Sequence, residues 1–151
     1  MDMGTLSDLY PRIHIHHQAF PEQLLGWTAV SVVNAICDLL KFSVVHCDIK
    51  PDNILINKDG EIKLCDFGES RVLKADVATS FSGTVQYLPP ERLCISENFD
   101  YERSDVWSLG ITLMELILNR VPYITNEKER KKLQEHEVVM YEKNLKPKYS
   151  I

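Results

Sequence analysis

The sequence predicts an α+β domain that consists mostly of helices and carries one small β-hairpin. Residues 21–41 and 104–119 are two long apolar segments of helical length. Residues 53–57 and 61–67 are two short apolar segments that flank the turn sequence Lys58-Asp59-Gly60. Because glycine readily adopts a positive φ at such a turn, this spacing predicts an antiparallel hairpin.

The first helix is predicted by its periodicity. Pro21 suits the first turn of a helix, and Glu22 favours the positive N-terminal end. Apolar side chains then recur every three or four residues, at Leu25, Ala29, Val32, Ile36 and Leu40. This spacing is typical of a helix with one face on the core.

The second helix is apolar on nearly all sides. Ser104 is the residue expected to cap its N-terminus. A helix without a polar face is usually surrounded by protein, so we expect it in the centre of the domain. Trp27 and Trp107 are expected in the core.

Two regions lack sustained periodicity. Residues 69–90 are rich in Ser, Thr, Gly and Pro, which predicts a long loop of the kind that often carries function. Residues 124–151 are highly charged, and we expect a surface helix followed by a tail.

Composition limits the partners and the compartment. The net charge of −5 argues against a nucleic-acid partner, because such a partner is usually held by a basic surface. No apolar run approaches the roughly 20 residues that cross a bilayer, so no membrane partner is expected. The four cysteines form no CxxC pair and no zinc spacing, which indicates reduced thiols and a cytoplasmic or nuclear location.

Residues 46–68 contain the residues with the clearest chemistry. Asp48 can accept the proton of a hydroxyl, and Lys50 can balance charge on a phosphoryl group. Asn53 and Asp66 offer oxygen atoms to a hard cation such as Mg²⁺. Together, these residue types predict magnesium-assisted transfer of a phosphoryl group to an alcohol.

Four segments resemble the eukaryotic protein kinases. They are "HCDIKPDN" and "CDFG", similar to the catalytic and magnesium loops, "GTVQYLPPERL", similar to the substrate-facing loop, and "SDVWSLGITLMELILNRVPY", similar to the central helix. Within the kinases, "KPDNILIN" and "PPERL" resemble the MAP kinase kinases, which are dual-specificity enzymes.

This resemblance implies a fold and a domain boundary. The fold would be the large lobe of a protein kinase, with the hairpin carrying the magnesium loop. Residues 1–123 would form a partial kinase domain, and residues 124–151 match poorly. ATP and Mg²⁺ would be cofactors, a MAP kinase would be the protein substrate, and an upstream kinase would act on the chain.

The resemblance also assigns roles to residues. Asp48 would be the catalytic base and Lys50 the phosphate-facing lysine, while Asn53 and Asp66 would hold Mg²⁺ and Leu55 would lie beneath the adenine. The supporting residues would be His46 and Phe67 in an apolar stack, Asp105 tying down the catalytic loop, Thr84 in the substrate groove, Ser80 as an activating phosphorylation site, and Glu91 in the Ala-Pro-Glu region.

The sequence departs from the kinase pattern at several places. Cys47 stands where most kinases have an arginine that pairs with a phosphorylated loop, and a thiol cannot replace that contact. Arg71 is either a substitute partner or a solvated surface arginine. The arginine that usually pairs with the glutamate at Glu91 has no candidate at the expected distance.

The 151 residues contain no Gly-rich phosphate loop and no lysine-glutamate pair of the small lobe. Since those elements position the nucleotide, we expect this chain by itself to bind ATP weakly and to turn over negligibly. Two interpretations stay open. The chain is a MAP kinase kinase-like enzyme represented by a partial catalytic domain, or it is a kinase-derived protein-binding module without catalysis.

Overall fold

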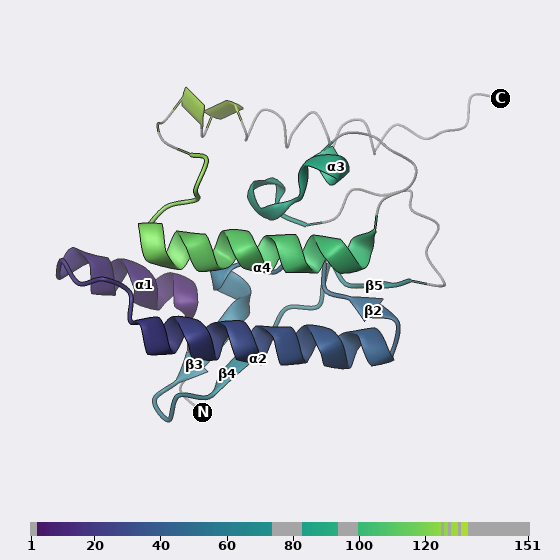
Figure 1. The fold of residues 1–151 in the computed structure, drawn as a ribbon, viewed down its shortest axis with the longest axis horizontal. Helices are drawn as coiled ribbons and strands as arrows, with labels where there is room; N and C mark the ends of the chain where they lie inside the picture. Colours follow the sequence, from purple (N-terminus) through teal and green to yellow (C-terminus); the bar gives the residue numbers. More distant parts are fainter. Residues whose placement is uncertain are drawn as a thin grey trace.

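A computed structural model describes residues 3–73, 83–93, 100–124, 126, 128–129 and 131–132. Helices α2 and α4 run side by side, and α1 lies beside one end of the pair (Figure 1). The elements in chain order are β1 (Met3–Thr5), α1 (Leu6–Ile15), α2 (Glu22–Lys41), β2 (Val44–Val45), η1 (Pro51–Asn53), β3 (Ile54–Asn57), β4 (Ile62–Leu64), β5 (Arg71–Val72), η2 (Val85–Tyr87), α3 (Pro90–Leu93) and α4 (Tyr101–Leu118).

The predicted hairpin is confirmed. Strands β3 and β4 pair antiparallel, with Ile54 opposite Leu64, and Gly60 has φ of +82° in the connecting turn. Strand β1 adds to the free edge of β3, which gives a three-stranded sheet in the order β1-β3-β4. Strands β2 and β5 form a second, two-stranded sheet that the short apolar pattern did not reveal.

The first predicted helix is also confirmed, and α2 forms the main contact between the hairpin and α4. Pro21 precedes the helix as its N-cap, in extended conformation. Val32 and Ile36 of α2 are buried together with Ile54 of the hairpin and with Leu109 and Leu116 of α4. This cluster fixes the hairpin against the two long helices.

The second predicted helix exists, but its expected cap is wrong. Helix α4 begins at Tyr101, and the side chain of Asp100 accepts hydrogen bonds from the backbone N–H groups of Glu102 and Arg103. Ser104 lies within the first turns and is buried. Asp and Ser are both favourable N-cap residues. Asp100 is the N-cap because it directly precedes the first N–H groups of the helix, which have no partner inside the helix.

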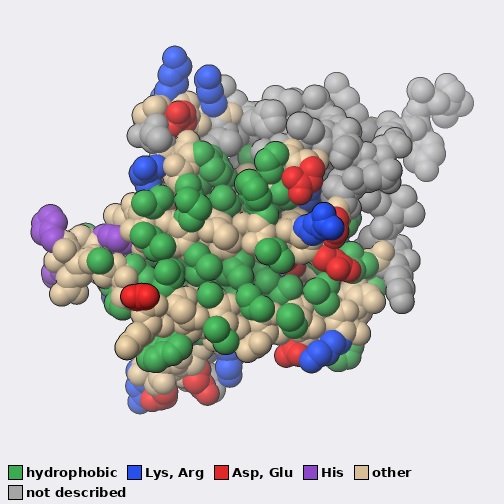
Figure 2. Space-filling view, viewed as in Figure 1, with side chains coloured by type: hydrophobic (Ala, Val, Ile, Leu, Met, Phe, Trp, Pro, Cys, Tyr) green, Lys and Arg blue, Asp and Glu red, His purple; other side chains and the backbone are tan. Residues whose placement is uncertain are grey.

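The expectation that α4 is buried on all sides is wrong as well. One side of the helix is buried, while Trp107 on the other side is 42% exposed and Trp27 of α2 is 58% exposed. Hydrophobic side chains therefore gather on the face formed by α2 and α4 (Figure 2). Sequence periodicity gives the apolar positions of a helix, but it does not show whether another element covers them.

The expectation that no apolar run is long enough to cross a bilayer is wrong for helix α2. Among the described residues, α2 is the one helix whose length and composition would allow it to cross a membrane. A helix of a protein core can have the same length and composition, and α2 packs against α4 and β4.

Candidate functional site

Asp48 lies at the centre of a hydrogen-bonded network in the loop after β2. Its Oδ1 accepts the N–H of Thr84 at 3.0 Å and the hydroxyl of Thr84 at 2.7 Å. Its Oδ2 lies 2.8 Å from the Nζ of Lys50 and accepts a hydrogen bond from the Nδ2 of Asn53 at 2.9 Å. A carboxylate has about four acceptor positions, and these donors fix the orientation of both oxygens.

Lys50 belongs to the same network. Its Nζ donates to the hydroxyl of Thr84 at 2.7 Å, so the lysine bridges Thr84 and Asp48. The residues at 48 and 50 come from one loop, and Thr84 comes from a segment more than thirty residues later. The network therefore joins two segments that both resemble parts of a kinase active site.

The pKa of Asp48 reflects this network. Burial raises the pKa of the carboxyl, but hydrogen bonds from Lys50, Thr84 and Asn53 and the charge of Lys50 outweigh burial and lower it below its ordinary value of 3.8. Asp48 is therefore ionised at neutral pH. An ionised and oriented carboxylate can accept a hydrogen bond from a hydroxyl group.

Asn53 presents one side of its amide to Asp48. Its Nδ2 donates both to the backbone oxygen of Asp48 at 2.8 Å and to the carboxylate at 2.9 Å. Both amide hydrogens are then used, and among the described residues none donates to the Oδ1 of Asn53. That neutral oxygen is the kind of ligand that Mg²⁺ accepts.

The hairpin brings Asp66 toward Asn53. The N–H of Cys65 donates to the backbone oxygen of Asn53 at 2.9 Å, and Asp66 is the next residue. Asp66 is exposed and has φ of +60°, and its Oδ1 accepts the N–H of Gly68 at 3.2 Å. Aspartate adopts this left-handed conformation more readily than most residues, and such positions cluster at functional sites.

Asn53 and Asp66 offer oxygen atoms of the kinds that Mg²⁺ binds. Mg²⁺ usually keeps several waters and is bound through one or two carboxylates together with substrate phosphates. Among the described residues, no group of three or more His, Cys, Asp or Glu side chains lies close enough to hold a metal.

Asp105 connects α4 to the loop that carries Asp48. Its two carboxylate oxygens accept the backbone N–H groups of His46 and Cys47, each at 2.8 Å. Burial raises the pKa of Asp105, and the two N–H groups lower it, with a net rise above 3.8. The carboxylate holds two consecutive peptide groups, and it thereby orients the start of the catalytic-loop sequence.

His46 lies between this loop and the residues after β4. Its ring is fully buried and lies 5.1 Å from the ring of Phe67 in an edge-on arrangement. Its Nε2 is 3.0 Å from the backbone oxygen of Cys65, and its Nδ1 accepts the N–H of Asp48 at 3.3 Å. Since Phe67 is 50% exposed, the stack is open on one side.

Cys47 occupies a tightly packed turn. The residue is buried with φ of +67°, and burial raises the pKa of its thiol to about 11 despite the nearby guanidinium of Arg92. Among the described cysteines, Cys37, Cys47 and Cys65 are free. Cys47 is therefore a neutral thiol inside the protein.

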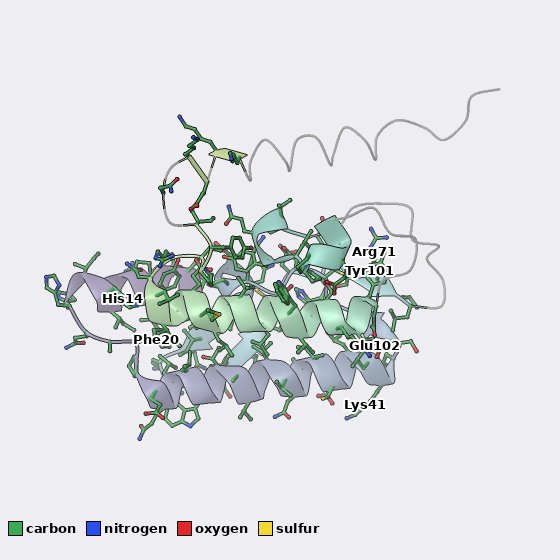
Figure 3. All side chains as sticks on the ribbon, turned by 45° about the horizontal axis from the view of Figure 1, so that its top comes forward. His14, Phe20, Lys41, Arg71, Tyr101 and Glu102 are labelled. Carbon is green, nitrogen blue, oxygen red and sulfur yellow. The ribbon has the colours of Figure 1, made fainter. Side chains whose placement is uncertain are left out.

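Arg71, Arg92 and Tyr101 form a cluster beside Cys47. The Cζ atoms of Arg71 and Arg92 lie 6.0 Å and 5.1 Å from the centre of the Tyr101 ring. Figure 3 shows Arg71 and Tyr101 together at the N-terminal end of α4. The sequence left two interpretations of Arg71 open. Because Arg71 is half-buried, the interpretation as a solvated surface arginine is wrong.

Two further predicted residues, Leu55 and Glu91, lie away from these contacts. Leu55 is half-buried on β3, opposite Lys63. Glu91 is exposed on α3, and no ion pair of Glu91 is present within the described ranges. Ser80 lies outside the described residues.

Sequence reasoning missed the role of Glu115. This buried carboxylate accepts the hydroxyl of Tyr10 at 2.8 Å and the hydroxyl of Tyr87 at 2.6 Å, and so it joins α1, η2 and α4. The signal was a single charged residue within the apolar run of residues 106–118. Such a group is buried only with hydrogen-bond partners, and both partners are distant in sequence.

Known proteins are similar in sequence to this chain. The family model of the protein kinase domain matches residues 1–151. The MAP kinase kinase skh1/pek1 of Schizosaccharomyces pombe is 42% identical over 120 residues, which are 80% of this chain and 32% of that relative. The match therefore spans about a third of the relative's length. The chain belongs to the protein kinase family and is related to the MAP kinase kinases.

Proposed function

We propose that this chain carries the acid-base and metal-binding part of a protein kinase site, which transfers the γ-phosphate of ATP to a protein hydroxyl. The observation that carries the proposal is the network of Asp48, Lys50, Asn53 and Thr84. It combines an ionised carboxylate, a lysine ammonium and an amide oxygen within one short loop.

Each residue has one task in this proposal. Asp48 orients the incoming hydroxyl and accepts its proton. Lys50 stabilises the negative charge that moves to the transferring phosphoryl oxygens. Thr84 holds both groups in place, because its hydroxyl accepts from Lys50 and donates to Asp48.

Asn53 and Asp66 would hold Mg²⁺, and Leu55 would lie beneath the adenine of ATP. The metal, when bound, neutralises charge on the phosphates. The proposal for Asn53 rests on its Oδ1, because its Nδ2 is used by Asp48. Phe67, His46 and Asp105 would support the two loops.

The finer assignment is to the MAP kinase kinase type. The name of the related yeast protein supports this type. A MAP kinase is then the proposed protein substrate, Ser80 is the proposed site of an upstream kinase, and the cytoplasm or the nucleus is the proposed location. Residues 1–123 are proposed to form a partial kinase domain that corresponds to the large lobe of the kinase fold.

The 151 residues by themselves are proposed to bind Mg²⁺-ATP weakly and to transfer phosphate negligibly. A thermal unfolding series with Mg²⁺-ATP tests the binding, because a ligand stabilises the state that it binds. We expect a small rise in Tm that is lost in Asn53→Ala and Asp66→Ala. The matched control is Asn34→Ala, an exposed asparagine on α2, which should keep the rise.

Two outcomes would contradict this proposal. If the Tm responds equally in all three variants, the nucleotide binds without the proposed metal ligands. If the purified chain transfers phosphate rapidly, and Asp48→Asn abolishes the transfer, the proposed weakness of the isolated chain is wrong.

The second candidate is a protein-binding module without catalysis. It is favoured by the exposed apolar side of α4, where Trp107 is 42% exposed. In this case, the surface around Thr84 and α4 would hold a partner, and Mg²⁺-ATP would leave the Tm unchanged. The same unfolding series therefore distinguishes the two candidates.

A further inference from the structure

Four buried polar residues lie along one side of α4. They are Asp105, Ser108, Thr112 and Glu115, which follow each other at steps of three or four residues, and each is 6% exposed or less. Residues at this spacing share one face of a helix. Because burial of a polar group is unfavourable unless the group is hydrogen-bonded, the contacts of this face show what the helix holds in place.

This polar face reaches both of the segments that meet at Asp48. Asp105 accepts two backbone N–H groups of the loop that carries Asp48. Ser108 donates to the backbone oxygen of Tyr87 at 2.7 Å, in the segment that carries Thr84. Asp105 and Ser108 are one helical turn apart, so a single rigid helix sets the distance between the two segments.

The hydroxyl of Ser108 has one hydrogen and two carbonyl oxygens within reach. The backbone oxygen of Tyr87 lies at 2.7 Å, and that of Ser104 lies at 3.0 Å. The Ser104 oxygen already accepts the N–H of residue 108 in the ordinary pattern of an α-helix. Among the described residues, Ser108 is the donor to the backbone oxygen of Tyr87, which is a buried residue. The shorter distance and the need of this buried oxygen for a donor place the hydrogen on the side of Tyr87.

Tyr87 transmits the position of α4 to Thr84. Its hydroxyl donates to Glu115 at 2.6 Å, so α4 holds Tyr87 both at its backbone and at the end of its side chain. The N–H of Tyr87 donates to the backbone oxygen of Thr84 at 2.9 Å, which closes the single turn of η2. Thr84 then donates its own N–H and its hydroxyl to Oδ1 of Asp48.

We infer that Ser108 is a positioning residue for Asp48 and that it acts through Tyr87 and Thr84. The buried hydroxyl of Ser108 fixes the carbonyl of Tyr87, the turn of η2 carries this position to Thr84, and Thr84 orients the carboxylate. This role deepens the proposed function, since it rests on Asp48 as the proton acceptor. The contact itself can be tested without phosphate transfer.

Ser108→Ala removes the hydroxyl that donates to Tyr87. The hydrogen bond from Thr84 lowers the pKa of Asp48, so a looser Thr84 should let this pKa rise. The amide hydrogen of Thr84, which donates to the same carboxylate, should exchange faster by roughly two- to tenfold, the factor expected for one net hydrogen bond. A carbon-detected NMR titration of the Asp48 carboxyl and amide hydrogen exchange of the 151-residue chain measure the two effects.

Ser104→Ala is the matched control. Ser104 is a buried serine one turn earlier on the same helix, and its hydroxyl accepts from Nη1 of Arg92 at 3.3 Å. The control therefore removes a buried hydroxyl that makes no contact with η2. It should leave the pKa of Asp48 unchanged, and it should not accelerate exchange at Thr84 beyond the change that global destabilisation explains.

A second pair of variants separates the hydroxyl from the size of the side chain. Ser108→Thr and Ser108→Val add the same bulk to the buried site, but only threonine keeps the donor. Ser108→Thr should restore the values of the wild type for both measurements relative to Ser108→Val, which should repeat the changes of Ser108→Ala. This rescue would not occur if the residue only filled space.

Three outcomes would overturn the positioning role. They are unchanged values in Ser108→Ala, equal changes in Ser104→Ala, and identical behaviour of Ser108→Thr and Ser108→Val. Each of them concerns the geometry at Asp48 and leaves the binding of Mg²⁺-ATP untouched. The proposed function is tested separately by the unfolding series with Mg²⁺-ATP, so a failure of one is distinguishable from a failure of the other.

Discussion

A Cβ atom at Gly83 would lie 2.2 Å from the backbone oxygen of Cys47. Gly83 has φ of +94° and directly precedes Thr84, whose N–H and hydroxyl both reach Asp48. Cys47 directly precedes Asp48, so the pair Gly83-Thr84 lies against the pair Cys47-Asp48. The close approach of the two backbones brings Thr84 within hydrogen-bonding distance of the Asp48 carboxylate.

Gly83→Ala should therefore destabilise the protein and disturb the network around Asp48. Both the left-handed φ and the clash with a backbone oxygen oppose the new methyl group, so we expect a loss of about 2 kcal/mol or more in the free energy of unfolding. Gly60→Ala is the matched control. Gly60 also has a positive φ of +82°, but an added Cβ would meet no atom within 4 Å.

Urea unfolding of the two variants measures this difference. The Gly60→Ala loss should be the smaller, about 1 kcal/mol, because it contains the backbone strain alone. Equal losses in both variants would show that the contact between Gly83 and Cys47 is not tight in solution.

Lys50→Met should raise the pKa of Asp48. The lysine gives the strongest of the interactions that lower this pKa, and burial, which raises it, remains in the variant. Thr84→Val should give a smaller rise, because it removes one hydrogen bond and leaves the charge of Lys50 in place. A carbon-detected NMR titration of the Asp48 carboxyl measures both values. A pKa that is unchanged in Lys50→Met would contradict the ion pair of 2.8 Å.

The elements that sequence reasoning predicted well are those formed by local interactions. The hairpin around Gly60 and the helix over residues 22–41 each follow from residues that are close in the chain. The same hairpin register sets the spacing of Asn53 and Asp66, because the N–H of Cys65 donates to the backbone oxygen of Asn53.

Long-range contacts required the structure or the family resemblance. Glu115 accepts hydrogen bonds from the hydroxyl groups of Tyr10 and Tyr87, which are 105 and 28 residues away in the sequence. No local pattern contains such a pairing. The exposed side of α4 was missed for a related reason, because the hydrophobicity of Val106 or Ile117 does not indicate whether another surface covers it.

Glu115 should make the stability of the protein depend on pH. Burial raises the pKa of this carboxyl above its ordinary value of 4.5, nearby Asp52 raises it further, and the two tyrosine hydroxyls oppose the rise. A raised pKa means that the folded state holds the proton more tightly than the unfolded state. This contribution to stability is complete below pH 4.5 and is lost as the pH rises through the pKa of the folded protein.

Glu115→Gln removes this titration. The free energy of unfolding of the wild type, minus that of Glu115→Gln, should therefore decrease from pH 4.5 toward neutral pH. Chemical denaturation of both proteins at several pH values gives the difference, in which the titrations of Asp48 and Asp105 largely cancel. A difference that increases with pH would mean that the tyrosine hydroxyls outweigh the burial of the carboxylate.

Asp105→Ala should release the backbone at the start of the catalytic-loop sequence. The buried N–H groups of His46 and Cys47 would lose their acceptors, and each unsatisfied group costs about 1–3 kcal/mol. Hydrogen exchange of these two amides should accelerate beyond the change that global destabilisation explains. Asp100→Ala is the matched control on the same helix, because it removes the N-cap at a cost of about 1 kcal/mol and does not touch either amide. If the two variants accelerate exchange at His46 and Cys47 equally for the same loss of stability, Asp105 does not anchor this loop.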